Sequence, residues 1–178
     1  MPDEPYIGPH YHTDKTCGLI VLLATYGNTT RQCMNWFVGG KWDYSFYWLF
    51  QGCFDEASRP TRQEITRDRA VMNYIDQVLP QNQDPTEQDY LDSEESFKTT
   101  LSLLNPKAVW LLGQAHYEPR PGGFIGSAEI VRQVLEIEPV CSWHPAATIG
   151  KRWILRDGWD KFNAQLQGIL DNTLHLAW

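Results

Sequence analysis

The residues best suited to chemistry lie near the end of the chain, in the segment PVCSWHPAATIGKRW, residues 139–153. His144 follows a short apolar run with the length of a buried strand, and the cations Lys151 and Arg152 come shortly after it. An imidazole can donate a hydrogen bond or transfer a proton near neutral pH. Lysine and arginine side chains commonly hold phosphate groups. The segment therefore indicates either ordinary loop chemistry or the rim of an active site.

The other apolar runs of the sequence also end in polar residues. These are, in chain order, Tyr26 and Asn28 after residues 18–24, Asn73 and Asp76 within or after residues 71–78, and Gly113, Gln114 and His116 after residues 108–112. In open α/β sheets, ligands bind outside the carboxyl ends of the strands. We therefore expect these polar residues to meet His144 at one cleft.

Strands and helices alternate in the elements that must position these residues. Apolar runs predict strands at 18–24, 71–78, 108–112 and 138–143. Helical patterns fall at 29–40, 42–50, 86–104, 127–135 and 154–170. This alternation predicts an α/β fold, namely a three-layer α/β/α sandwich with a mostly parallel central sheet of about four strands.

Two of the expected helices have a clear apolar face. Thr86 is the expected N-cap of the helix at 86–104, and acidic residues occupy its first turn. The apolar side of this helix carries Tyr90, Phe97, Leu101 and Leu104. The apolar side of the last helix carries Trp159, Phe162, Leu166, Ile169 and Leu170. Both faces are expected to pack against the sheet.

The composition predicts a single domain over residues 1–178, with residues 1–16 as an extended N-terminal tail. An aromatic content of 13% and a charged content of 21% indicate a packed core and exclude disorder. The net charge of -7 argues against a general nucleic-acid coat protein, although it leaves room for a local basic patch. The beginning of the chain lacks a signal-peptide pattern, and no apolar run approaches ~18 residues. We expect a cytoplasmic monomer that does not contact membranes.

Several common sites are missing from the sequence. The four cysteines, at positions 17, 33, 53 and 141, form no CxxC pair, so we expect free thiols and no metal. The phosphate-binding patterns GxGxxG and GxxxxGK[ST] are absent, as is the GxSxG nucleophile pattern. This weakens the nucleotide-hydrolase, dinucleotide-enzyme and α/β-hydrolase hypotheses, and we expect no cofactor.

Two motifs resemble those of a known family. The segment LLNPKAVWLLGQA, residues 103–115, joins a helix to a strand that ends in glycine, and SWHPAATIGKRW, residues 142–153, combines His-Pro with a downstream arginine. Both are similar to motifs of the uracil-DNA glycosylase superfamily. The resemblance covers roughly residues 18–170 and is nearest to a poorly characterised branch. It implies a glycosylase that cuts a flipped, deaminated or modified base from DNA without a metal.

The sequence departs from this family in two motifs. Members usually carry Asp, Asn or Glu in the first motif, whereas LLATYG, residues 22–27, keeps Tyr26 and Gly27 but has no acid. A register shifted by two residues places Asn28 where some members carry a catalytic asparagine. In the second strand, Ile75 or Asp76 falls where the base-reading asparagine is expected.

The resemblance implies a role for each candidate site residue. His144 would stabilise charge on the departing base, and Asn28 would hold the attacking water. The base would be contacted by Tyr26, Phe46, Asn73 and Asp76, with Trp36 as another stacking candidate. Residues 147–149, ending in Ile149, would enter the DNA groove, and Lys151 and Arg152 would hold phosphates. His116 is placed to act as a second site histidine.

Two alternatives remain open from the sequence alone. The chain could keep the glycosylase fold without its chemistry and bind a nucleotide, a nucleic acid or a protein; the acidic net charge and the missing acid in the first motif favour this. It could also be a small-molecule α/β enzyme with His144 as general acid or base. A basic strip along the strand ends would favour the glycosylase, and a closed pocket without a groove would favour the small-molecule enzyme.

Overall fold

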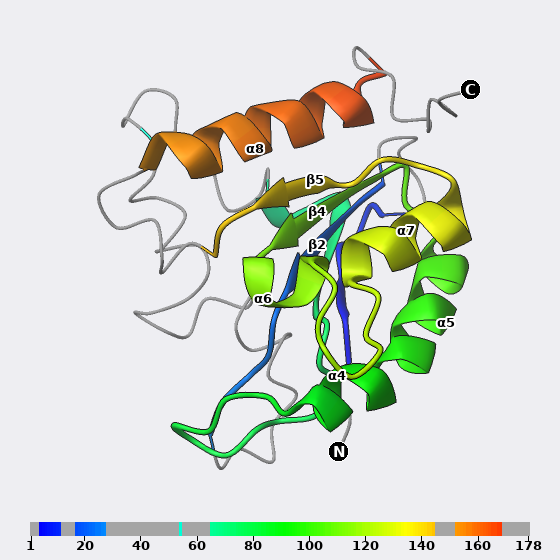
Figure 1. Cartoon of the computed structure of the whole chain (residues 1–178). Helices are drawn as coiled ribbons and strands as arrows, with labels where there is room; N and C mark the ends of the chain where they lie inside the picture. The colour runs from blue at the N-terminus through cyan, green and yellow to red at the C-terminus, as the bar shows by residue number, and fades with distance from the viewer. Residues whose placement is uncertain (1–3, 12–16, 28–53, 55–64, 145–151, 169–178) are drawn as a thin grey trace, which may run out of the picture.

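The computed structural model describes residues 4–11, 17–27, 54, 65–144 and 152–168 (Figure 1). The helices expected at 29–40 and 42–50 therefore lie outside the described residues, as do Ile169 and Leu170 at the end of the last helix. No helix that the structure describes has both the length and the apolar character needed to cross a bilayer.

The described strands form one five-stranded sheet. They are β1 (Tyr6–Ile7), β2 (Gly18–Leu22), β3 (Arg69–Asn73), β4 (Ala108–Leu112) and β5 (Val140–Ser142), arranged in the order β1-β3-β2-β4-β5. β3, β2, β4 and β5 are parallel to their neighbours, whereas β1 is antiparallel to β3. The α/β class is confirmed. The sheet is mixed and not mostly parallel, because the chain before β2 adds a strand in the opposite direction.

The continuous apolar runs form strands that are covered on both faces. In β2, Leu19 and Val21 face one hydrophobic cluster, and Ile20 and Leu22 face another. Successive side chains of a strand point to opposite faces, so a strand buried on both sides needs apolar residues at every position. β4 follows the same rule, with Val109 and Leu111 toward one cluster and Trp110 toward the other.

One face of the sheet is covered by α4 (Glu87–Asp92), α5 (Glu94–Leu104) and α7 (Ser127–Leu135) (Figure 1). Tyr90, Phe97, Leu101 and Leu104 are all buried there, as their helical spacing predicts. Full burial of such a side chain contributes roughly 1.5–3 kcal/mol to folding. Apolar burial therefore fixes these helices on the sheet.

The opposite face is covered by α8 (Arg152–Leu166), the orange helix of Figure 1. Trp159, Phe162 and Leu166 are buried, as predicted, and the Phe162 ring lies 5.8 Å from the Trp110 ring of β4. Gly158 allows this close approach, because a Cβ atom there would lie 2.8 Å from Nε1 of Trp110.

The segment after β3 differs from the prediction. β3 ends at Asn73, so the strand expected at 71–78 begins and ends too late. The helix expected at 86–104 is interrupted at Ser93, giving α4 and α5. Its N-cap is confirmed, since the Thr86 hydroxyl accepts from the Asp89 N–H and the Asp89 carboxylate accepts from the Thr86 N–H. This capping box satisfies two backbone donors at the start of the helix.

The first described residues are part of the fold, and the expectation of an extended tail over 1–16 is wrong for residues 4–11. Tyr6–Ile7 pairs with β3, and Tyr11 is 1% exposed. The Tyr11 hydroxyl donates to the carbonyl oxygen of Leu104 at 3.2 Å, which joins this segment to the end of α5. A two-residue strand has no recognisable period in the sequence, so its pairing could not be read from the pattern.

Candidate functional site

The strand order creates a switch point at the carboxyl ends of β2 and β4. β2 comes first among the four parallel strands in the chain, and the next two, β3 and β4, lie on either side of it. The connections after β2 and β4 therefore leave in different directions. Such a crevice is where open α/β sheets bind ligands.

A hollow of about 340 Å³ lies at this position. It is lined by Leu23 after β2, by Gly113, Gln114 and Ala115 after β4, and by Trp143 and His144 after β5. Its volume is at the lower end of the roughly 300–1,000 Å³ typical of small-molecule pockets. The hollow therefore suits one small ring compound, and among the described residues that line it there is no carboxylate.

Gly113 brings the ends of β4 and β5 together. Its φ of 121° is a backbone conformation that residues with a side chain rarely adopt. A Cβ atom at Gly113 would lie 3.7 Å from the Cβ of His144, which places the two residues side by side. The Gly113 N–H donates to the Ser142 carbonyl oxygen at 2.9 Å, so the ladder between the strands continues up to the hollow.

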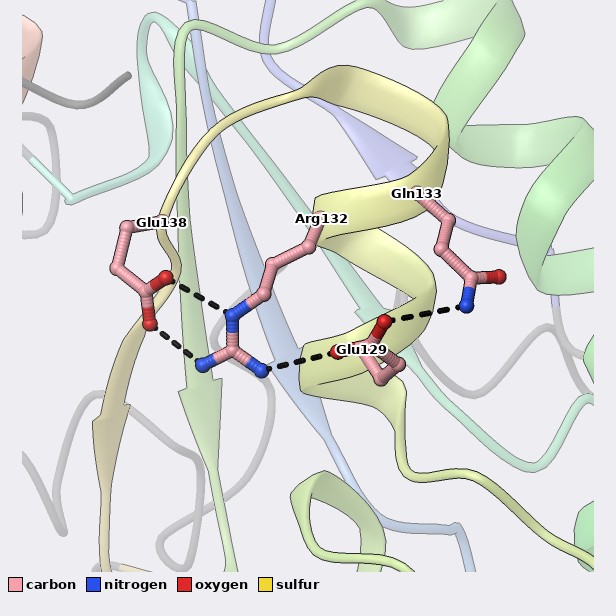
Figure 2. Close-up of polar contacts among 4 residues, drawn as sticks. All are labelled: Glu129, Arg132, Gln133 and Glu138. Carbon is pink, nitrogen blue, oxygen red and sulfur yellow. Dashed lines mark hydrogen bonds and ion pairs between the residues drawn. The ribbon is translucent and has the colours of Figure 1, made fainter. Parts of the chain in front are cut away.

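The approach to β5 is held by a charged network on α7 (Figure 2). Arg132 donates through Nε and Nη2 to the two carboxylate oxygens of Glu138, at 2.8 and 2.5 Å. It also contacts Glu129 at 3.4 Å, and Glu129 accepts from the Gln133 amide. A two-pronged guanidinium–carboxylate pair fixes direction as well as distance. It therefore orients the segment that leads into β5 and His144.

His144 is a half-buried imidazole that lines the hollow. Burial lowers its pKa below the ordinary value of 6.5. The ring is therefore mostly neutral near pH 7, and a neutral imidazole has one N–H donor and one acceptor nitrogen. It can contact a polar ring atom in the hollow without placing a net charge beside it.

His116 does not serve as the second site histidine that the sequence suggested. It is fully buried in α6 (Gln114–Tyr117), with Nε2 3.1 Å from the Leu112 carbonyl oxygen and Nδ1 2.9 Å from the Ser127 hydroxyl oxygen. A carbonyl oxygen only accepts, so Nε2 carries the hydrogen and Nδ1 of the neutral ring accepts from Ser127. Burial lowers the His116 pKa to about 4. The residue is a structural tie between β4, α6 and α7.

The other described candidates lie on the β3 side and do not line the hollow. Asn73 is 2% exposed, and its amide donates to the Thr25 hydroxyl at 2.6 Å. Tyr26 is 42% exposed and is bridged to Leu79; burial and the nearby Asp84 carboxylate raise the pKa of its phenol. Asp76 is half-buried. Asn73 therefore holds the two chain segments together, and the structure does not bring these three residues to His144.

Several sequence candidates lie outside the described residues. These are Asn28, Trp36, Phe46, residues 147–149 with Ile149, and Lys151. Arg152 is the first residue of α8, and its side chain is not among those described.

Three residues that line the hollow, Leu23, Ala115 and Trp143, were not named as site residues from the sequence, although the segments 113–117 and 143–152 were expected at the cleft. One signal for Trp143 was available. It follows the buried Ser142 at the end of β5, and strand alternation turns the next side chain to the other face.

No protein-family model matches the chain, and no curated protein is significantly similar to it. Among the described residues, no group of three or more His, Cys, Asp or Glu side chains could hold a metal ion. The functional inference therefore depends on the strand order, the hollow and His144.

Proposed function

We propose that this chain is a DNA glycosylase-like protein with the three-layer fold of the uracil-DNA glycosylase superfamily. Its substrate is a deaminated or modified base, of the uracil type, that has been flipped out of DNA. The observation that carries this proposal is the position of His144, a mostly neutral imidazole in a hollow of ring-compound size at the switch point. The His-Pro motif at residues 144 and 145 supports it from the sequence.

The reaction is hydrolysis of the bond between the base and C1′ of deoxyribose. Water adds to C1′ while the C1′–N bond breaks, and the electron pair leaves with the base, which then takes up a proton. Negative charge accumulates on the base oxygens in the transition state. A hydrogen bond from His144 to such an oxygen would stabilise that charge, and a donor of this kind contributes about 2.7–4 kcal/mol. A neutral ring suffices as the donor.

The remaining roles rest on the sequence motifs. Asn28 is proposed to hold the attacking water, and Phe46 to stack on the base. Ile149 would enter the DNA groove, while Lys151 and Arg152 would contact phosphates. Tyr26 and Asp76 lie on the β3 side of the strand ends, where they would contact the part of the nucleotide that lies outside the hollow.

A strand-cleavage assay tests this function. Oligonucleotides carrying uracil, hypoxanthine, xanthine or hydroxymethyluracil are incubated with the protein and then treated with alkali, which cuts at abasic sites. We expect product from at least one substrate, and a rate lower by roughly 10²–10³ for His144→Ala. Asn28→Ala should also slow the reaction.

His10→Ala is the matched control for His144→Ala. His10 is an exposed histidine whose backbone contacts Arg67, just before β3, at the edge of the sheet opposite the hollow. Its substitution should leave the rate unchanged. No abasic product from any substrate would refute the enzyme, and product that survives both His144→Ala and Asn28→Ala would refute the residue assignment.

A second candidate is a protein of the same fold that binds a base or nucleotide without cutting it. The absence of a carboxylate among the described residues that line the hollow favours it, because many hydrolytic sites use one to activate water. This candidate predicts saturable binding of the modified oligonucleotide with no product after prolonged incubation.

A further inference from the structure

Trp143 presents an aromatic surface to the hollow. Ser142, just before it, is 3% exposed and accepts from Nε1 of Trp110 at 2.9 Å on the α8 side of the sheet. Alternation turns Trp143 away from that side, and it lines the hollow while remaining 39% exposed. Stacking a base on an aromatic side chain contributes roughly 1–3 kcal/mol. A planar ring is the ligand that such a surface favours.

Gln114 is a second lining residue of the hollow, and its side chain is polar. It is the first residue of α6 and is exposed, and its Nε2 donates to the Glu118 carboxylate at 2.9 Å. A primary amide has two N–H donors and a carbonyl oxygen, and the Glu118 contact uses one donor. A donor beside an acceptor in one plane matches a lactam edge, in which a ring N–H lies next to a C=O group.

The rest of the lining favours an uncharged ring. Leu23 and Ala115 are apolar, and the described residues that line the hollow include no Asp, Glu, Lys or Arg. Against these described residues, a charged ligand would lose hydration without gaining an opposite charge. The described part of the lining therefore favours a neutral heterocycle over a phosphate or a carboxylate.

We propose that Trp143 and Gln114 determine specificity in this hollow, Trp143 by stacking on a neutral planar lactam ring and Gln114 by pairing with its N–H/C=O edge. This inference deepens the proposed function and rests on it for the placement of the base. It concerns recognition, which can be measured without catalysis.

The test measures equilibrium binding of nucleosides to the full chain. NMR spectra of the protein are recorded as the nucleoside concentration is raised into the millimolar range. Deoxyuridine presents the lactam edge, and N3-methyldeoxyuridine lacks the N–H of that edge. In deoxycytidine an unprotonated ring nitrogen and an amino group replace the N–H and the C=O. Wild type should bind deoxyuridine roughly tenfold more tightly than the other two nucleosides. This ratio corresponds to a difference of about 1.4 kcal/mol in binding free energy. Absence of deoxyuridine binding by wild type would overturn the proposal.

Substitutions separate the two contacts. Trp143→Leu should weaken deoxyuridine binding roughly 5- to 150-fold, whereas Trp143→Phe should retain most of it. Gln114→Leu should bind deoxyuridine and its N3-methyl analogue equally. Gln88→Leu is the matched control, because Gln88 on α4 donates to Asp92 one turn along, as Gln114 does to Glu118. It should leave all three affinities unchanged.

The outcomes distinguish this inference from the proposed function. Unchanged deoxyuridine affinity in Trp143→Leu, or unchanged discrimination in Gln114→Leu, overturns the specificity assignment even if the strand-cleavage assay yields product. Selective nucleoside binding that depends on both residues, with no abasic product, supports the specificity assignment and refutes the enzyme. Circular dichroism of each variant establishes that it is folded.

Discussion

At the residue scale, the two histidines near the hollow have opposite roles although they lie close together. A Cβ at Gly113 would be within 4 Å of atoms of both His116 and His144. His116 has both ring nitrogens engaged by Leu112 and Ser127, and it is fully buried. His144 lines the hollow. Two residues of one type thus differ because the His116 ring packs between β4 and α7, whereas the His144 ring lies at the rim of the hollow.

The buried imidazole of His116 should make stability depend on pH. Its folded pKa of about 4 lies below the ordinary 6.5 of an unfolded chain, so protonation favours unfolding. The stability contribution of the neutral ring is complete above about pH 6.5 and declines as the pH falls toward 4, by up to about 3 kcal/mol. Urea denaturation across this range measures it.

The control for this prediction is His116→Asn, which removes the titrating group. Carboxylates also titrate in the lower part of the range, so the difference between the two proteins isolates the imidazole. The variant should be less stable at neutral pH, because contacts with Leu112 and Ser127 are disturbed. An equally steep pH dependence in both proteins would contradict the prediction.

The sequence located some site residues and missed others for a physical reason. It placed His144 at the end of a strand, which the structure confirms, because a short apolar run ending in polar residues is a strong signal. It placed Tyr26, Asn73 and Asp76 at the same cleft, but they lie toward β3. Which strand ends share a hollow depends on the order of strands in the sheet, and no local pattern encodes that order.

At the element scale, local signals were sufficient where packing and propensity agree. The predicted strand at 108–112 and helix at 127–135 have the bounds of β4 and α7. The first is an uninterrupted apolar run that meets a glycine, and the second follows a loop rich in Pro and Gly. The break at Ser93 and the four-residue α6 have no such signal, because each depends on how the chain turns over the sheet.

Gly158 of α8 provides a test of packing against helix propensity. Replacing glycine by alanine in a helix usually stabilises by about 0.5–1 kcal/mol. At this position the new methyl group would collide with the Ser142 hydroxyl and the Trp110 ring. Overpacking costs roughly 1–3 kcal/mol, so Gly158→Ala should destabilise the protein. Thermal or urea denaturation gives the sign directly.

A double-mutant cycle sharpens the Gly158 test. Ser142→Ala removes the hydroxyl that the new methyl group would meet, although it also removes the acceptor of Trp110 Nε1. The loss of folding free energy caused by Ser142→Ala should therefore be smaller in the Gly158→Ala protein than in the wild-type protein. Additive effects would mean that α8 shifts to accommodate the methyl group without contacting Ser142.

At the scale of the whole molecule, the proposed DNA partner must be reconciled with a net charge of -7. Two cations, Lys151 and Arg152, are the proposed phosphate contacts. Each phosphate neutralised on duplex DNA contributes about -0.9 to the slope of log K against log salt, so we expect a slope of about -2. Fluorescence anisotropy at several salt concentrations measures it. Lys151→Gln combined with Arg152→Gln should bring the slope near zero.

The matched control for the salt experiment is Lys161→Gln combined with Arg156→Gln. These cations of α8 pair with Asp157 and Asp160 and are not among the proposed DNA contacts. The control keeps the same net charge as the test variant. An equal loss of slope in both would mean that overall charge, and not a local contact, governs DNA binding.

The antiparallel pairing of β1 with β3 also covers an edge of the sheet that could otherwise pair with another copy of the chain. Without Tyr6–Ile7, the backbone N–H and C=O groups along that side of Arg69–Asn73 would form an open border beside an apolar strand. Such a border recruits strands from other molecules and promotes aggregation. A chain shortened past Ile7 should therefore be less soluble while its hollow stays intact, because the exposed edge and the hollow lie on different strands. These first residues are therefore needed for solubility even though they are distant from His144.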